Sequence, residues 1–126
     1  MRFGRERLFA LLLATGATAL GLGIRAASGE TAAKLAGDAL WAVDVYALVR
    51  FVAPALALRR VVLITVGISF AIELLQLTPL PAHLSSQHPL LRLIFGSAFH
   101  PADLIAYAVG ALAAGGLERL ALGRRV

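Results

Sequence analysis

The sequence lacks several residue types on which many protein functions depend. Cysteine is absent from its 126 residues, which excludes disulfides, thiolate metal sites and cysteine nucleophiles. Charged residues make up only 15%, whereas a soluble domain usually has about 25%. Lysine occurs once among twelve basic residues, and the arginines lie mostly at the ends of apolar segments. The net charge of +5 therefore does not indicate nucleic-acid binding. Phosphate loops, nucleophile elbows and zinc-protease motifs are also missing.

Apolar residues are what the chain has in excess. They form 60% of it, and the mean hydropathy is +0.83. A bilayer core about 30 Å thick is crossed by a helix of about 17 to 25 apolar residues. Four segments have this length, at about residues 8–24, 35–58, 61–77 and 101–122. The sequence therefore predicts an all-α polytopic membrane protein, with residues 1–126 forming a single domain of four transmembrane helices.

The first apolar segment has a second interpretation. Its basic start, its leucine-rich centre and the small residues Ala17 to Ala19 are typical of a cleaved signal peptide. The apolar run continues to Ile24, however, which favours a transmembrane helix. Between the third and fourth segments, Pro79, Pro81 and Pro89 interrupt any continuous helix. Residues 90–95 are apolar but too few to span, so we expect a short interfacial or re-entrant helix there.

The basic residues predict how the segments are oriented. Cytoplasmic loops are enriched in arginine and lysine. Eight basic residues flank one side of the predicted membrane: Arg2, Arg5, Arg7, Arg59, Arg60, Arg119, Arg124 and Arg125. The other side has only three: Arg25, Lys34 and Arg92. Both termini are therefore expected in the cytoplasm.

Small residues recur every four positions in the fourth segment, at Ala106, Gly110 and Ala114. This spacing is the usual basis of close helix packing in lipid, because it lets two backbones approach each other. We expect the fourth helix to contact a neighbouring helix along this face.

Ionisable residues within membrane spans are costly, and they are candidates for function by default. With both termini inside, three helices direct polar side chains toward one outward-facing region. We predict a ligand-binding cluster made of six residues: Asp38, Trp41, Glu73, Gln76, Asp103 and Tyr107. Glu73 and Gln76 share a helix face, as do Asp103 and Tyr107. Because carboxylates outnumber cations there, a hydroxyl or amine group is a more suitable ligand than a phosphate.

Four further residues are auxiliary candidates for this site: Asp44, Arg50, Arg92 and His100. Several polar residues also have structural interpretations. Asp38 and Asp103 lie near predicted helix starts, where a carboxylate is favoured by the helix dipole. Arg50 is placed so that it could extend toward the inner headgroups. The three histidines show no metal-binding spacing, so we expect neither a metal nor a cofactor.

Three motifs resemble a known family. Residues 37–41 (GDALW), 73–76 (ELLQ) and 96–110 (GSAFHPADLIAYAVG) are similar to a family of small bacterial membrane proteins without established function. That family is sometimes given a YjgA-type ribosomal maturation label, which no residue here supports. The resemblance implies location in the bacterial cytoplasmic (inner) membrane.

A more distant resemblance is to VanZ-like proteins, four-helix membrane proteins associated with glycopeptide-antibiotic tolerance. It implies correspondence of their motif residues with Glu73, Gln76, Arg92, Asp103 and Gly110. Tyr107 departs from the VanZ pattern, which usually has asparagine there, so the ligand does not transfer with the motif.

Three classes of function remain open. The first is binding of a membrane-lipid headgroup or small envelope ligand, such as a glycolipid or lipid-linked molecule, at the outer leaflet. The second is a non-catalytic accessory or assembly role, as a homo-oligomer or with a membrane-protein partner. The third, which we favour least, is an intramembrane enzyme acting on lipid-linked substrates, with carboxylates of different pKa as acid and base.

Overall fold

The structure is a computed structural model that describes residues 4–27, 30–91 and 101–123. Helices dominate these residues, and no strand occurs among them. The chain order is α1 (Arg5–Ala27), α2 (Glu30–Val52), α3 (Leu58–Leu75), the short α4 (Leu80–Gln87) and α6 (Pro101–Leu122). Each of the four long helices overlaps one predicted apolar segment.

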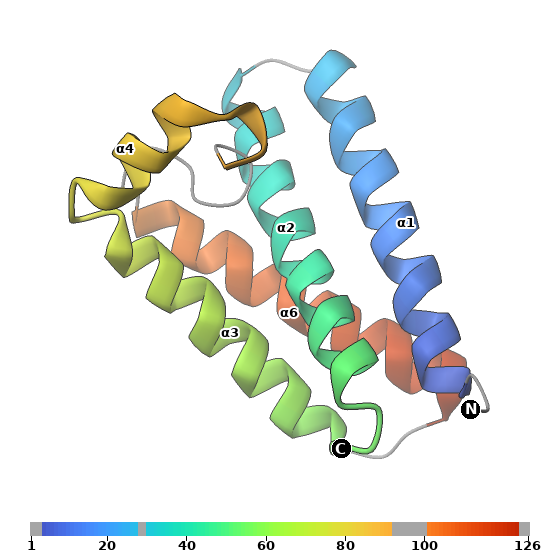
Figure 1. Cartoon of the computed structure of the whole chain (residues 1–126). Coiled ribbons are helices and arrows are strands. Elements are labelled where there is room, and N and C mark those ends of the chain that lie inside the picture. Colours follow the sequence, from blue (N-terminus) through green and yellow to red (C-terminus); the bar gives the residue numbers. More distant parts are fainter. Residues whose placement is uncertain (1–3, 28–29, 92–100, 124–126) are drawn as a thin grey trace.

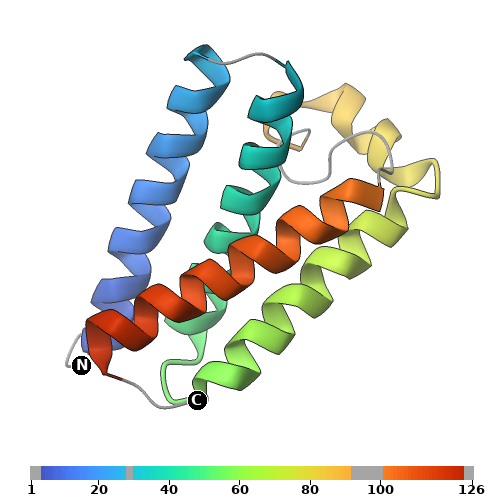
Figure 2. The same ribbon diagram turned by 180° about the vertical axis from the view of Figure 1, so that it is seen from behind.

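The four long helices alternate in direction. Figures 1 and 2 show that α1 and α3 begin at the end of the bundle where α2 and α6 finish. Helix α2 contacts α1, α3 and α6, and α6 also packs along α3. Helix α4 lies at the opposite end, near the start of α6 (Figure 1). We name these the basic end, where α1 begins, and the α4 end.

Proline explains two differences from the predicted segments, which are the early end of α2 and the presence of α4. The second segment was expected over 35–58, but α2 begins at Glu30 and ends at Val52. Pro54 cannot supply a backbone N–H to continue the helix, and residues 53–57 form a turn. Helix α4 was not expected, yet proline is favoured in the first turn of a helix and begins one here. The predicted helix at 90–95 lies mostly outside the described residues.

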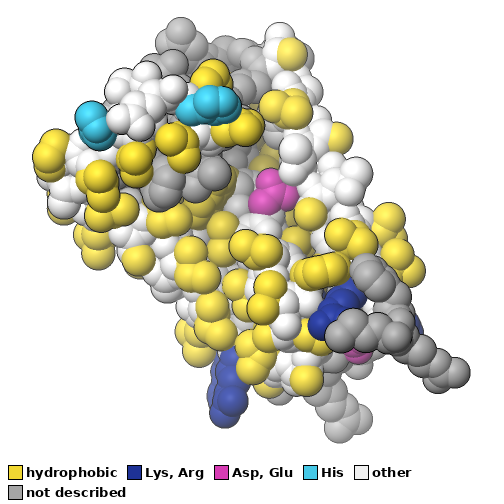
Figure 3. Space-filling model, in the orientation of Figure 1, with side chains coloured by type: hydrophobic (Ala, Val, Ile, Leu, Met, Phe, Trp, Pro, Cys, Tyr) yellow, Lys and Arg dark blue, Asp and Glu magenta, His cyan; other side chains and the backbone are white. Residues whose placement is uncertain are grey.

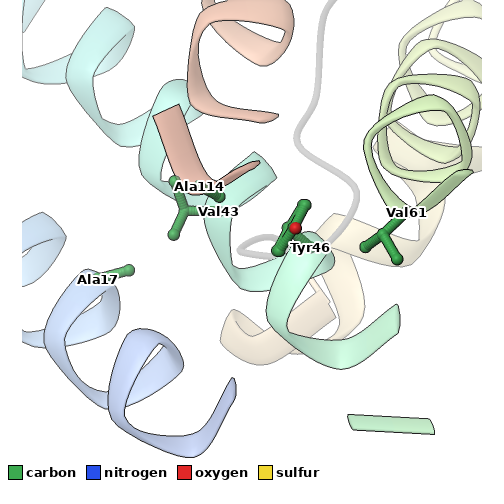
Figure 4. Close-up of a cluster of buried hydrophobic side chains, with 5 residues drawn as sticks. All are labelled: Ala17, Val43, Tyr46, Val61 and Ala114. Carbon is green, nitrogen blue, oxygen red and sulfur yellow. The ribbon is translucent and has the colours of Figure 1, made fainter. Parts of the chain in front are cut away.

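The centre of the bundle is built from small and medium side chains. Figure 4 shows the buried cluster, which α1, α2, α3 and α6 all supply: Ala17, Val43, Tyr46, Val61 and Ala114. The predicted contact face of α6 is confirmed, because Ala106, Gly110 and Ala114 are all buried. At Gly110 the backbones of α6 and α2 are so close that a Cβ atom would lie 2.0 Å from Ala39 O.

The outside of the bundle is largely apolar, as Figure 3 shows for one face. Leucine, isoleucine and valine side chains are exposed on all four long helices. Two helices, over Arg5–Ile24 and Pro101–Leu122, are long and apolar enough to cross a membrane. By the same measure α2 and α3 do not qualify, because both include several charged residues.

Candidate functional site

A lysine joins two helices at the α4 end of the bundle. Lys34 Nζ lies 2.7 Å from both carboxylate oxygens of Asp103, at the start of α6. It also lies 3.1 Å from Asp38 Oδ2, one turn further along α2. Asp103 is only 3% exposed, whereas the Lys34 side chain is 45% exposed. One ammonium therefore compensates two carboxylates from different helices and covers the more buried one.

The pKa of Lys34 follows from these neighbours. Lys34 lies near the start of α2, one residue before the apolar segment (35–58) that the sequence predicts to span the membrane. Partial burial disfavours its charged form and acts to lower the pKa, but the carboxylates of Asp103 and Asp38 together outweigh that effect. The pKa of the Lys34 ammonium is consequently raised, and it stays protonated at every physiological pH.

A second polar contact lies about one turn along α6 from Asp103. The Tyr107 hydroxyl donates a hydrogen bond of 2.9 Å to Glu73 Oε2, and the Glu73 side chain on α3 is fully buried. The Trp41 ring, from α2, packs against the Tyr107 ring with 5.5 Å between centroids and a tilt of 52°. Helices α2, α3 and α6 therefore meet at Tyr107, which has an aromatic neighbour on one side and a carboxylate on the other.

Five of the six predicted site residues thus lie in two contact groups about one turn of α6 apart, which we together call the α4-end cluster: Asp38, Trp41, Glu73, Asp103 and Tyr107, together with Lys34. Gln76, the sixth predicted residue, follows α3 directly. Its backbone N–H donates to Ile72 O at 3.2 Å and to Glu73 O at 3.1 Å, so it lies one turn beyond the buried carboxylate.

Asp44 lies apart from this cluster, on the side of α2 that faces α1. Its Oδ2 accepts a hydrogen bond of 3.1 Å from the Thr18 hydroxyl. Its Oδ1 is buried and has no hydrogen-bond partner among the described residues. Asp44 therefore connects α1 to α2 and does not reach the other predicted site residues.

Arg50 does not extend toward the inner headgroups, which corrects one interpretation of the sequence. Its side chain is fully buried at the basic end, with Nε 2.5 Å from Glu118 Oε1 and Nη2 3.0 Å from Glu118 Oε2. Its Nη1 donates to the carbonyl oxygens of Pro54 and Leu56, at 3.1 and 2.7 Å. Glu118 also accepts a hydrogen bond from the Tyr46 hydroxyl. Arg50 therefore ties the end of α2 to α6 and to the turn before α3.

Sequence reasoning missed Lys34, Tyr46 and Glu118. Two of them had a detectable signal, because Lys34 and Asp38, like Tyr46 and Arg50, are four residues apart and share a helix face. Glu118 had no such signal in the sequence, since a carboxylate near the last turn of a helix resembles an exposed terminal residue. Arg92 and His100, two auxiliary candidates, lie outside the described residues. Among the described residues, no group of three or more His, Asp or Glu side chains is arranged to hold a metal ion.

These features define a class: an all-helical bundle with an apolar exterior, two helices able to span a membrane, and charged side chains turned inward. Residues 28–111 match the family described as protein of unknown function (DUF2809). The chain belongs to this family. The matched region includes every residue of the α4-end cluster and ends before Glu118. Searches among curated proteins and among solved structures found no match.

Proposed function

We propose that the chain is a four-span protein of the bacterial inner membrane with both termini in the cytoplasm. Several of the charged residues that set α2 and α3 apart from the other two long helices face the protein interior rather than lipid. Arg50 and Glu73 are fully buried, and each has a partner on α6. Intramembrane charges in helix bundles are expected to face inward and to be paired in this way. The outward residues of both helices include exposed apolar side chains such as Leu48, Val52 and Leu63.

The distribution of exposed arginines supports the orientation. Arg5, Arg59, Arg60 and Arg119 are exposed at or near the basic end, and Figure 3 shows basic side chains toward that end. Because cytoplasmic loops are enriched in such residues, we propose that the basic end faces the cytoplasm and that the α4 end faces the outside.

The absence of cysteine gives a direct test of this topology. We expect the single variant Ser86→Cys, on α4, to react with a membrane-impermeant maleimide in intact cells. The single variant Arg59→Cys should react only after the membrane is permeabilised. Both residues are exposed, so access depends on the side of the membrane alone. The reverse labelling pattern would refute the orientation, and equal labelling of both in intact cells would refute membrane insertion.

We further propose that the α4-end cluster binds a polar headgroup or small envelope ligand. The hydroxyl or amine groups of the ligand would bond to the carboxylates of the cluster. The observation that supports this most is the meeting of three carboxylates from three helices, beside two aromatic rings, with one lysine among them. With Lys34 protonated, Asp38, Glu73 and Asp103 leave a net negative charge when ionised. Such a site favours cations and hydrogen-bond donors over phosphate. The resemblance of Glu73, Gln76 and Asp103 to the VanZ pattern favours a role in the cell envelope.

We expect Glu73→Gln and Asp103→Asn to remove most ligand binding, about tenfold or more, because each replaces a charged acceptor. The measurement is mass spectrometry of lipids that co-purify with the protein, each variant being compared with the wild type. Gly116→Ala is the control, since its added Cβ would meet no atom within 4 Å and Gly116 lies outside the cluster. If Glu73→Gln and Asp103→Asn both retain the same lipids as the wild type, the proposed binding function is wrong.

The mutual pairing of the cluster supports a second candidate, a non-catalytic assembly role. Lys34 compensates Asp38 and Asp103, and Tyr107 donates to Glu73, so these groups satisfy one another without a ligand. In that case the Glu73 and Asp103 variants should lower the unfolding temperature and leave the co-purified lipids unchanged.

A further inference from the structure

An open groove of about 210 Å³ runs between α1 and α2 in the half of the bundle nearer the basic end, which is the cytoplasmic half in the proposed orientation. Seven residues line it: Ala10, Leu11, Ala14, Asp44, Ala47, Leu48 and Phe51. Its hollow results from side-chain size. Ala10 and Ala47 are buried and too short to fill the space, while Leu11 and Leu48 are 44% and 63% exposed and form the two rims.

The two ends of the groove differ in chemistry. At the end of the groove nearer the start of α1, the Arg7 guanidinium lies 5.6 Å from the Phe51 ring centroid. Arg7 Nε also donates a hydrogen bond of 3.1 Å to Phe51 O. A guanidinium has five N–H donors, and this bond uses one. At the deep end Asp44 accepts a hydrogen bond from Thr18 through Oδ2, while Oδ1 is buried. The groove surface is therefore hydrocarbon, with a cation at its cytoplasmic end.

The dimensions suit one lipid chain. Asp44 and Phe51 are about 10 Å apart along the helix axis, at ~1.5 Å per residue. This corresponds to roughly the inner third of a bilayer core about 30 Å thick. An acyl chain is a single unbranched chain of methylene groups, so it can lie along the alanine floor between the leucine rims.

We propose that this groove binds one acyl chain of an anionic phospholipid from the cytoplasmic leaflet, with the lipid phosphate at Arg7. The proposal depends on the membrane orientation described above and is independent of ligand binding at the α4 end. Arginine binds phosphate oxygens through paired N–H donors. Arg5, exposed two residues earlier, adds positive charge at the same end. A lipid such as phosphatidylglycerol, which has no ammonium group, matches this charge best.

The test is native mass spectrometry of protein released from nanodiscs that contain equal amounts of phosphatidylglycerol and phosphatidylcholine. The wild type is expected to retain one phosphatidylglycerol per chain. Ala14→Leu fills the groove and should reduce this retention at least about fivefold. Ala19→Leu is the matched control, because Ala19 is exposed on α1 and does not line the groove. Arg7→Gln should remove the preference for phosphatidylglycerol, again by about fivefold.

Two safeguards make the result decisive. Leu48→Ala trims an exposed rim without crowding the core, so it should reduce retention even if Ala14→Leu does not fold. Asp103→Asn should leave the retained phosphatidylglycerol unchanged, which separates this site from the α4-end cluster. Equal retention in the Leu48→Ala variant and the Ala19→Leu control would overturn the groove site. Equal retention of both lipids by the wild type would overturn the role of Arg7.

Discussion

Replacing Glu118 with leucine is expected to destabilise the protein by about 3–5 kcal/mol, because it leaves the Arg50 guanidinium buried without its carboxylate. Both side chains are fully buried, so neither water nor lipid headgroups can replace the lost partner. The change also removes the acceptor of the Tyr46 hydroxyl. The measurement is the unfolding midpoint and free energy in mixed detergent micelles.

Two comparisons isolate the buried charge as the cause. Arg119→Ala alters the next residue of α6, which is exposed, and should change the free energy of unfolding by less than about 0.5 kcal/mol. The double variant Arg50→Met with Glu118→Leu removes both charges, so it should be more stable than Glu118→Leu alone. If the double variant is the less stable of the two, the penalty does not come from an unpaired guanidinium.

The position of this ion pair explains why its loss should be so costly. Arg50 also donates to two carbonyl oxygens of the turn between α2 and α3, where Pro54 has ended the helix. One side chain thus satisfies backbone groups that the broken helix leaves open and connects them to α6. The Arg50–Glu118 contact joins α2 to α6 at the basic end, and through Arg50 also to the turn before α3, as Lys34 joins α2 and α6 at the other end.

The sequence predicted the number and order of long helices from the length of its apolar segments. It predicted the α4-end cluster less completely. The depth of Asp38, Glu73 and Asp103 along their helices could be counted, because each follows from a helix direction and a rise per residue. The residues that these carboxylates contact could not be predicted, since the contacts depend on how each helix is rotated about its axis. Lys34 is missed for a different reason, since the apolar segment begins only at residue 35, whereas α2 begins at Glu30.

Asp44 is a second residue whose depth in the membrane could be predicted but whose direction could not. Its depth agrees with that of a site residue, but it faces α1 and bonds to Thr18. The hydropathy of α2 gives no direction for its polar side chains, because charged residues occur around much of its circumference. Helix rotation is set instead by close contacts between backbones, and among the described glycines the closest such contact is at Gly110.

Gly110→Ala is therefore the substitution with the widest expected effect. A Cβ atom there would lie 2.0 Å from Ala39 O and 2.8 Å from Ala39 C, both of which are backbone atoms that cannot rotate away. Helices α2 and α6 would have to separate. We expect a loss of stability of about 3 kcal/mol, at the upper end of what overpacking costs. The measurement is the same micelle unfolding experiment.

The functional consequence follows from the neighbours of this contact. Ala39 adjoins Asp38, and Gly110 lies one turn from Tyr107, so separating the two helices also separates Lys34 from Asp103 and Trp41 from Tyr107. Any ligand bound by the α4-end cluster should be lost with them. Gly116→Ala is the matched control on the same helix, because its Cβ would meet no atom within 4 Å. It should leave binding intact and stability equal or slightly higher. If Gly110→Ala behaves like Gly116→Ala, the close crossing of α2 and α6 is not what positions the cluster.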